Sequence, residues 1–225
     1  GATDGYDATL TRGGANVVNA LFNIDTVIAG ANAGDELEGL TAGGTFNTGT
    51  PFNTFTDLGA NATLEFSGFE TFGTAGTNVI IIDQVFTGNI SGGAGQTDVF
   101  QFLPGGQVTG TIDGGDPGSN DTIDFSGFGS AVDVDLAGAT VAGLVGSFTN
   151  IEIINGSALS DTLRGSGLFT LNGDGDGAAN GIEFNNVENL IGSAGADTFD
   201  FADGANFTSI DGGDGDNTFD YADVS

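Results

Sequence analysis

The stretch from Ile210 to Tyr221, IDGGDGDNTFDY, places a loop of glycine and aspartate directly before a segment in which apolar and acidic residues alternate. Phe219 and Tyr221 fall on one side of that segment and Asp220 on the other. Alternation with a period of two predicts a β-strand with one buried face, and glycine permits the left-handed backbone of a tight turn. The stretch therefore predicts a turn followed by a half-buried strand.

Related segments recur along the chain. Each has a glycine, a short polar loop, an Asp or Asn, and then apolar residues two apart, and they start at Gly73, Gly92, Gly114, Gly156, Asn172, Gly192 and Gly212. Repetition at such a regular spacing, roughly 20 residues, is typical of solenoids. We predict an all-β fold, a parallel β-solenoid (β-helix or β-roll) of about 11 coils, forming a single continuous domain over residues 1–225. A sandwich of short strands is the alternative.

The charge balance restricts the partners. The chain has 31 Asp and Glu residues against two basic residues, Arg12 and Arg164, which gives a net charge of -29. Its 38% hydrophobic content, with 19 Phe, predicts a folded rather than a disordered chain. Binding to nucleic acid depends on Lys and Arg, so the composition excludes nucleic acid as a partner. No apolar run approaches the roughly 18 residues of a membrane span, and we expect no membrane insertion.

Cations are the natural partners of such a chain. It has no His and no Cys, which argues against zinc and copper. A hard cation with oxygen ligands fits the residues that remain, and Ca²⁺ fits flexible loops with many weak oxygen ligands better than Mg²⁺ does.

Two segments carry a resemblance to a known family. GSAGADTFDF from Gly192 and GGDGDNTFDY from Gly212 resemble the nonapeptide G-G-x-G-x-D-x-U-x of the repeats-in-toxin (hemolysin-type) family, in which U is apolar. The first departs from the motif at Ser193, where the family has glycine, and the second at Asn217, where the family has Asp. The resemblance implies a calcium-binding β-roll, and it implies that the acidic loops hold the ions.

The candidate calcium ligands are the acidic residues and the one asparagine of these loops: Asp98, Asp116, Asp121, Asp161, Asp174, Asp176, Asp197, Asp211, Asp214, Asp216 and Asn217. The copies do not follow one another directly, as the family's nonapeptides do. We therefore expect them to stack on one edge and share ions there, with uncharged turns at the other edge. We expect a further group of strand carboxylates to face outward and solubilise the protein, namely Asp124, Asp133, Asp135, Glu152 and Asp200.

The whole chain resembles the repetitive regions of secreted bacterial surface proteins and adhesins. That likeness implies an extracellular, cell-surface location and a structural, calcium-dependent role without catalysis. Calcium ions are the expected partners, together with further copies joined end to end or a continuation of the same chain, of which this sequence would then be an excerpt.

Other readings remain open. The chain can be a subunit of a self-assembling filament that needs no ion, or each acidic loop can be a solvated turn in which Asp bonds its own backbone. An enzyme acting on polysaccharides is a further alternative, because β-helices include such enzymes and a pair of carboxylates suffices for hydrolysis. The scarcity of basic residues opposes a lyase acting on acidic sugars.

Overall fold

The computed structural model is all-β. It describes the backbone of ten strands within residues 5–73, residues 77–222 in full, and residue 224. All the regular secondary structure in these residues is β-strand, as the alternating sequence pattern predicts. This part of the chain contains no helix long and apolar enough to cross a bilayer.

Most strands belong to two sheets of 13 strands each. The first sheet contains β2 (Thr9–Arg12), β3 (Ala15–Val18), β6 (Asp35–Glu38), β10 (Thr71–Gly73), β12 (Val85–Phe86), β13 (Asn89–Ser91), β15 (Gln107–Asp113), β17 (Asp133–Asp135), β18 (Thr140–Val141), β19 (Val145–Thr149), β21 (Thr162–Arg164), β25 (Asn189–Ile191) and β27 (Ser209–Asp211). The second contains β5 (Thr26–Ile28), β7 (Gly44–Asn47), β8 (Asn53–Asp57), β9 (Ala62–Ser67), β11 (Val79–Ile82), β14 (Val99–Phe102), β16 (Thr122–Asp124), β20 (Ile153–Asn155), β22 (Leu168–Leu171), β23 (Gly177–Ala179), β24 (Ile182–Asn185), β26 (Thr198–Phe201) and β28 (Thr218–Asp220). A separate pair is formed by β1 (Gly5–Tyr6) and β4 (Leu21–Phe22).

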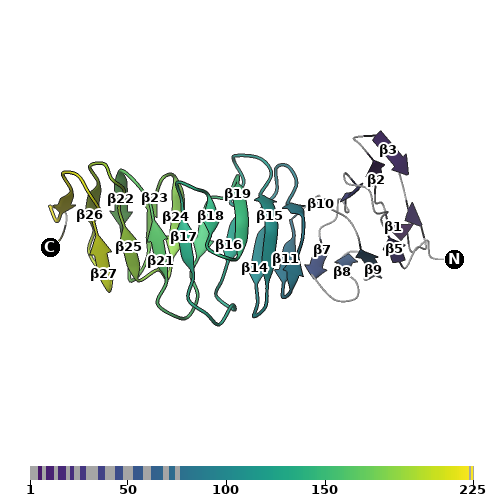
Figure 1. Ribbon diagram of the computed structural model, residues 1–225, viewed down its shortest axis with the longest axis horizontal. Coiled ribbons are helices and arrows are strands. Elements are labelled where there is room, and N and C mark those ends of the chain that lie inside the picture. The colour runs from purple at the N-terminus through teal and green to yellow at the C-terminus, as the bar shows by residue number, and fades with distance from the viewer. Residues whose placement is uncertain are drawn as a thin grey trace.

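Both sheets are mostly parallel. From β25 to β28 the chain passes from one sheet to the other at each turn, so that β25 pairs with β27 and β26 with β28. Leu190 lies opposite Ile210 and Phe199 opposite Phe219, which confirms the spacing predicted from the motif copies in this region. Figure 1 shows the strands from β11 to β28 stacked side by side along the long axis.

The predicted spacing is wrong where a three-stranded antiparallel meander enters a sheet. The strands β17–β18–β19 form one such meander and β22–β23–β24 another. In each meander the first strand pairs with a later strand of the same sheet, β17 with β21 and β22 with β26. The last strand pairs with an earlier one, β19 with β15 and β24 with β20. Phe169 therefore lies opposite Phe199. The sequence separation of these two is one and a half times that between Phe199 and Phe219. The inserted hairpin lengthens the chain between paired strands without adding a passage to the other sheet.

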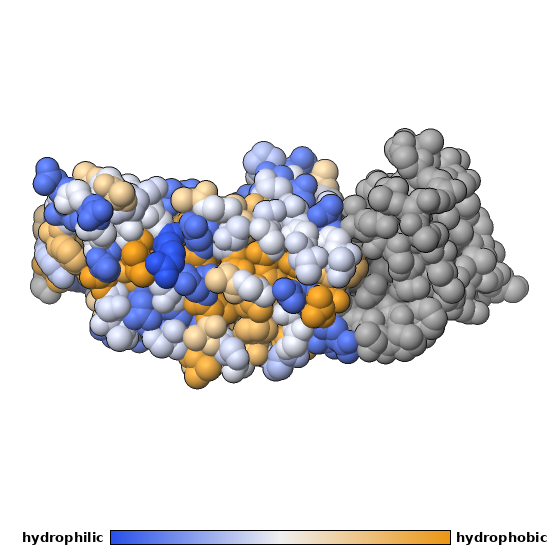
Figure 2. Space-filling view, in the orientation of Figure 1, coloured by the Kyte–Doolittle hydropathy of each residue, from blue (hydrophilic) through white to orange (hydrophobic). Residues whose placement is uncertain are grey.

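The core is a row of apolar side chains along the stack. In β26 the side chains of Phe199 and Phe201 are buried and that of Asp200, between them, faces outward. Parallel pairing in register places like residues on top of one another, and Phe199 stacks on Phe169 with ring centroids 4.6 Å apart. On the outside, the face in Figure 2 carries apolar residues along its middle with polar residues on either side.

Candidate functional site: the acidic residues of the turns

Ten of the residues that stand immediately before a strand form a connected set, which we call the turn ladder. They form three series, in which each residue precedes a strand paired with the next: Asn78, Asp98, Asp121 and Glu152; Val132, Asp161 and Glu188; and Gly167, Asp197 and Asn217. Within each series, the carbonyl of one position accepts the N–H of the first strand residue after the next position, as in Thr122 N to Asp98 O at 2.9 Å. Its own N–H lies just outside the sheet and needs another acceptor.

Side chains of the turn ladder supply that acceptor. In the first series, Asn78 N donates to Asp98 Oδ1 at 2.7 Å and Asp98 N donates to Asp121 Oδ1 at 2.7 Å. Asp121 N then donates to Glu152 Oε2 at 3.0 Å. Each side chain therefore reaches back to the neighbouring strand and satisfies a backbone N–H there.

The third series repeats this arrangement near the C-terminal end of the stack. Gly167 N donates to Asp197 Oδ1 at 2.5 Å, and Asp197 N donates to Asn217 Oδ1 at 2.9 Å. Asn217 accepts this bond as Asp does in the other loops, because one side-chain oxygen is enough. The first and the third series lie at the turns that lead from the first sheet to the second.

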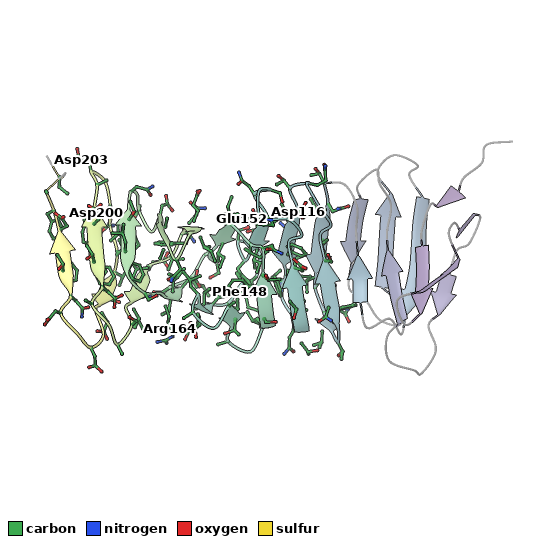
Figure 3. All side chains as sticks on the ribbon, turned by 90° about the horizontal axis from the view of Figure 1, so that it is seen from above. Asp116, Phe148, Glu152, Arg164, Asp200 and Asp203 are labelled. Atoms are coloured by element: carbon green, nitrogen blue, oxygen red, sulfur yellow. The ribbon has the colours of Figure 1, made fainter. Side chains whose placement is uncertain are left out.

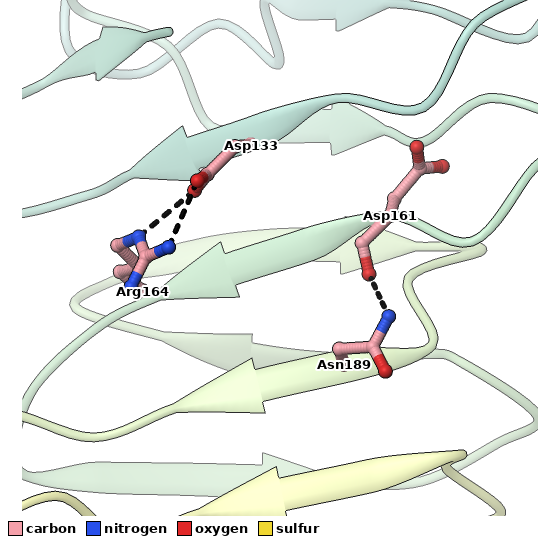
Figure 4. Close-up of polar contacts among 4 residues, drawn as sticks. All are labelled: Asp133, Asp161, Arg164 and Asn189. Carbon is pink, nitrogen blue, oxygen red and sulfur yellow. Dashed lines mark hydrogen bonds and ion pairs between the residues drawn. The ribbon is translucent and has the colours of Figure 1, made fainter.

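The second series lies at the opposite edge. Asp161 precedes β21, a strand of the first sheet, and its Oδ1 accepts Val132 N at 2.7 Å. Asp161 N donates to Glu188 Oε2 at 2.8 Å, and Asn189 Nδ2 donates to Asp161 O at 2.8 Å (Figure 4). The prediction of a single acidic edge is therefore wrong. The Gly156 copy begins at the end of a second-sheet strand, whereas the Gly92, Gly114, Gly192 and Gly212 copies begin at the end of a first-sheet strand.

In two of the loops, the serine that directly follows the first glycine satisfies the second carboxylate oxygen. Ser193 donates its N–H to Asp197 Oδ2 at 2.7 Å and its Oγ lies 3.2 Å from the same oxygen. Ser157 donates its N–H to Asp161 Oδ2 at 2.5 Å and its hydroxyl to Asp161 Oδ1 at 2.9 Å. In both loops serine stands where the family motif has its second glycine.

The first series is less completely bonded. Asp121 Oδ2 accepts the hydroxyl of Ser119 at 2.9 Å, whereas Asp98 Oδ2 is buried and accepts no hydrogen bond from the described residues. Burial raises the pKa of Asp98 to about 7, against the effect of the hydrogen bonds from Asn78, and the nearby Asp121 carboxylate adds to the rise. Burial also raises the pKa of Asp121.

The other predicted ligands lie at the surface. Asp116, Asp174, Asp211, Asp214 and Asp216 are exposed, and Asp176 is half-buried. Asp174 Oδ1 accepts Asn206 Nδ2 at 2.9 Å, Asp176 Oδ1 accepts Asn186 N at 3.0 Å, and Asp211 Oδ1 accepts Gly213 N at 3.0 Å. Figure 3 shows Asp116 at the same side of the molecule as Glu152.

This geometry divides the eleven predicted ligands into two kinds. Asp98, Asp121, Asp161 and Asp197 are almost completely buried, and each directs one carboxylate oxygen at a backbone N–H group. Within the described residues no three acidic side chains are grouped so that they hold one metal ion. The exposed carboxylates around residues 211–216 remain open to solvent cations.

Sequence reasoning missed Glu152 and Glu188 as members of the turn ladder. Glu152 is expected from sequence to face outward and solubilise the protein, but its Oε2 accepts the N–H of Asp121. Both glutamates end a recurring tetrapeptide, TNIE and NNVE, which immediately precedes a strand. That recurrence, at the position which Asp holds elsewhere, is the signal that identifies them.

The strand carboxylates differ from one another. Asp133 and Arg164 form an exposed bidentate ion pair, with Arg164 Nη2 2.8 Å from Asp133 Oδ2 (Figure 4), and this pairing raises the pKa of Arg164. Asp124 is only 9% exposed, with Oδ1 accepting Ser126 N at 3.0 Å and Oδ2 accepting Gln101 Nε2 at 3.3 Å. The prediction that the Asp124 side chain faces outward is therefore wrong.

A groove of about 430 Å³ tests the alternative of a polysaccharide-active enzyme. It lies where β16, β20 and β24 end, and Asp124 is the only acidic residue in a lining otherwise made of Asn, Ser, Gly and Ala. Hydrolysis by paired carboxylates needs a second acid across the scissile bond. The groove therefore offers no support for that alternative.

Comparison with known proteins identified no matching family model, no similar curated protein and no similar solved structure. The resemblance to the repeats-in-toxin family accordingly rests on the motif residues alone. Membership of that family, calcium binding and a cell-surface location stay predictions.

Proposed function

We propose that this chain is a non-catalytic structural segment, a β-solenoid whose coils are joined by the turn ladder. The observation that carries the proposal is the set of seven backbone N–H groups that donate to a side chain of the neighbouring coil. A hydrogen bond to a charged group contributes about 1.5–3 kcal/mol, and a buried N–H left without a partner costs about 1–3 kcal/mol. The ladder thus makes each coil depend on the next.

The proposed role is mechanical. Parallel strands in register place Phe169, Phe199 and Phe219 in one stack, with ring centroids 4.6 and 5.2 Å apart. The turn ladder holds the edge of the same coils through Asp197 and Asn217. An elongated element built in this way suits a spacer or surface rod, which is the role that the resemblance to bacterial surface proteins implies.

Calcium is proposed as a stabiliser of the exposed carboxylates and not of the buried ladder. Asp200 and Asp220 lie side by side in register on β26 and β28, and like charges on neighbouring strands destabilise a sheet. Asp211, Asp214 and Asp216 add exposed negative charge in the adjoining turn. Calcium in an extracellular medium would reduce this repulsion.

The test is thermal unfolding in chelator and in millimolar calcium, combined with small-angle X-ray scattering. The proposal expects a folded, elongated particle in chelator, with a radius of gyration well above the roughly 17 Å of a globular chain of this length. Calcium is expected to raise the Tm by a few degrees, and Asp214→Asn with Asp216→Asn to reduce that gain. A compact particle would contradict the solenoid. Unfolding in chelator would contradict the ion-independent ladder.

A further inference from the structure

Three of the loops begin with Gly-Gly, at Gly92, Gly114 and Gly212, and in each the second side-chain atom of the ladder residue lies against the first glycine. In the Gly114 loop that atom, Asp121 Oδ2, accepts the hydroxyl of Ser119, whereas the other two loops contain no serine. A methyl group added at Gly92 would lie 2.5 Å from Asp98 Oδ2, and one added at Gly212 would lie 2.6 Å from Asn217 Nδ2. The two atoms therefore occupy corresponding places against the first glycine. One is a carboxyl oxygen and the other an amide nitrogen.

In the Gly212 loop this atom is a hydrogen-bond donor. Asn217 Nδ2 donates to the carbonyl oxygens of Gly213 and Asp214, both at 3.3 Å. Gly213 has a φ of 71°, and its N–H is directed at Asp211 Oδ1, away from the ladder residue. Gly93 has the same left-handed conformation, with a φ of 89°. The Gly212 loop thus withholds the N–H that Ser193 supplies to Asp197 and presents carbonyl oxygens in its place.

Asp98 meets no compensating positive charge. It is completely buried, and its Oδ1 accepts both Asn78 N at 2.7 Å and Asn78 Nδ2 at 2.8 Å. The titratable groups on the side of the next loop are all acidic: Asp121, which bonds to Asp98 N, and beyond it Asp113 and Glu152. The loop on the other side, residues 73–78, has no titratable residue in its sequence. An ionised Asp98 would be a buried anion with an unpaired oxygen.

We propose that Asp98 is a proton-binding site, in which the folded protein holds its carboxyl group as the neutral acid and Oδ2–H donates to the loop carbonyls as Asn217 Nδ2 does. Release of this proton to solvent leaves an unpaired buried anion beside Asp121, and the turn formed by residues 92–98 loosens. The pKa of about 7 that burial gives Asp98 places this change near neutrality.

The direction of the pH dependence follows from proton counting. Between the pKa of an unfolded Asp, about 4, and the folded value of about 7, the folded state binds a proton that the unfolded state has lost. The free energy of unfolding therefore falls as the pH rises through this interval and is constant above it. Asp121, whose pKa is also raised, acts in the same direction, so a variant is needed to isolate Asp98.

Asp98→Asn is that variant, because Asn217 shows that an asparagine fills this position with a donor. Thermal unfolding is followed from pH 5 to pH 8 in chelator, which removes any contribution of calcium. We expect the Tm of the wild type to fall by at least about 3 °C more than that of Asp98→Asn between pH 5 and pH 7. The matched control is Asp197→Asn, which loses the bond from Ser193 N and is expected to lower the Tm at every pH while keeping the full pH dependence.

A direct readout keeps the test valid if Asp98→Asn does not fold. In the wild-type protein labelled with ¹³C at the Asp carboxyls, we expect the Asp98 carboxyl to titrate near neutrality. Titration of Asp98 near pH 4 would overturn the proposal. So would unchanged pH dependence in Asp98→Asn, or a loss of Tm in that variant that appears only when calcium is present, which would indicate a bound cation.

Discussion

Asp161 and Asp214 come from copies of one sequence motif, but the structure gives them different tasks. Asp161 is fully buried at the start of a strand and accepts hydrogen bonds from Val132 and Ser157. Asp214 is exposed in a turn, where its backbone carbonyl accepts a bond from Asn217. Position relative to the strand therefore decides the role. The acid immediately before a strand holds the neighbouring strand, and an acid earlier in the turn, such as Asp214, carries surface charge.

Removal of a buried ladder acid is expected to have the largest effect. Asp161→Ala takes the acceptor from Val132 N and from both the N–H and the hydroxyl of Ser157. We expect a loss of about 3 kcal/mol in the free energy of unfolding, because buried donors remain without partners. Urea denaturation measures it, with Asp214→Ala as the control. Equal losses in the two variants would break the distinction between buried and exposed acids.

Replacement of one oxygen by an amide is expected to cost less. Asp197→Asn keeps an acceptor for Gly167 N but turns an amide donor toward the N–H of Ser193. We expect a loss of about 1–2 kcal/mol. The double variant Asp197→Asn with Ser193→Gly restores the Gly-Gly form found with Asn217 and should recover part of this loss. No recovery in urea denaturation would contradict the pairing of Gly-Gly with Asn.

A ladder glutamate provides a weaker test. Glu188→Gln retains an oxygen that can accept Asp161 N and loses only the charge. Since charged hydrogen bonds are roughly twice as strong as neutral ones, we expect a loss of about 1 kcal/mol, and a larger loss for Glu188→Ala. The exposed Glu183 serves as the control for a change in net charge. A Glu183→Gln variant as destabilised as Glu188→Gln would show that Glu188 acts only through its charge.

The smallest change is expected at the exposed acids. Asp214→Asn with Asp216→Asn removes two negative charges from a chain of net charge -29 and leaves the turn ladder intact. In chelator and at low salt we expect the free energy of unfolding to be unchanged or higher by up to about 0.5 kcal/mol, because repulsion decreases. Thermal unfolding measures the difference, which added salt should abolish. A large loss of stability in chelator would place these residues among the structural ones.

The all-β class and the buried face of each strand could be predicted from sequence. Alternation around Phe199 and Phe201 leaves no other arrangement, and the spacing of the last two motif copies predicts the stacking of Phe199 on Phe219. The meanders could not be found from the spacing of motif copies, because that spacing does not show whether a strand reverses. Asn180 and Gly181 form the two-residue turn between β23 and β24, both with positive φ, and Asn-Gly is the strongest short hairpin signal.

The positions of the buried turn-ladder acids were predictable from sequence, but their hydrogen-bond partners were not. The motif marks Asp161 and Asp197 correctly as special, yet sequence cannot show whether an acid at the start of a strand points to an ion or to a backbone N–H. That choice depends on the neighbouring strand, whose ladder residue lies 27 residues later in the case of Asp161 and Glu188. Serine at position 157 or 193 is the local signal for the second outcome, because it brings its own donors to the carboxylate.

Amide hydrogen exchange in chelator tests the ladder most directly. The N–H groups that donate to ladder side chains belong to Asn78, Asp98, Asp121, Val132, Asp161, Gly167 and Asp197. If side chains of the neighbouring coil hold them, these amides are protected without calcium to nearly the same degree as the strand amides of the core. Rapid exchange of these amides in chelator, with protection appearing only when calcium is added, would contradict the account.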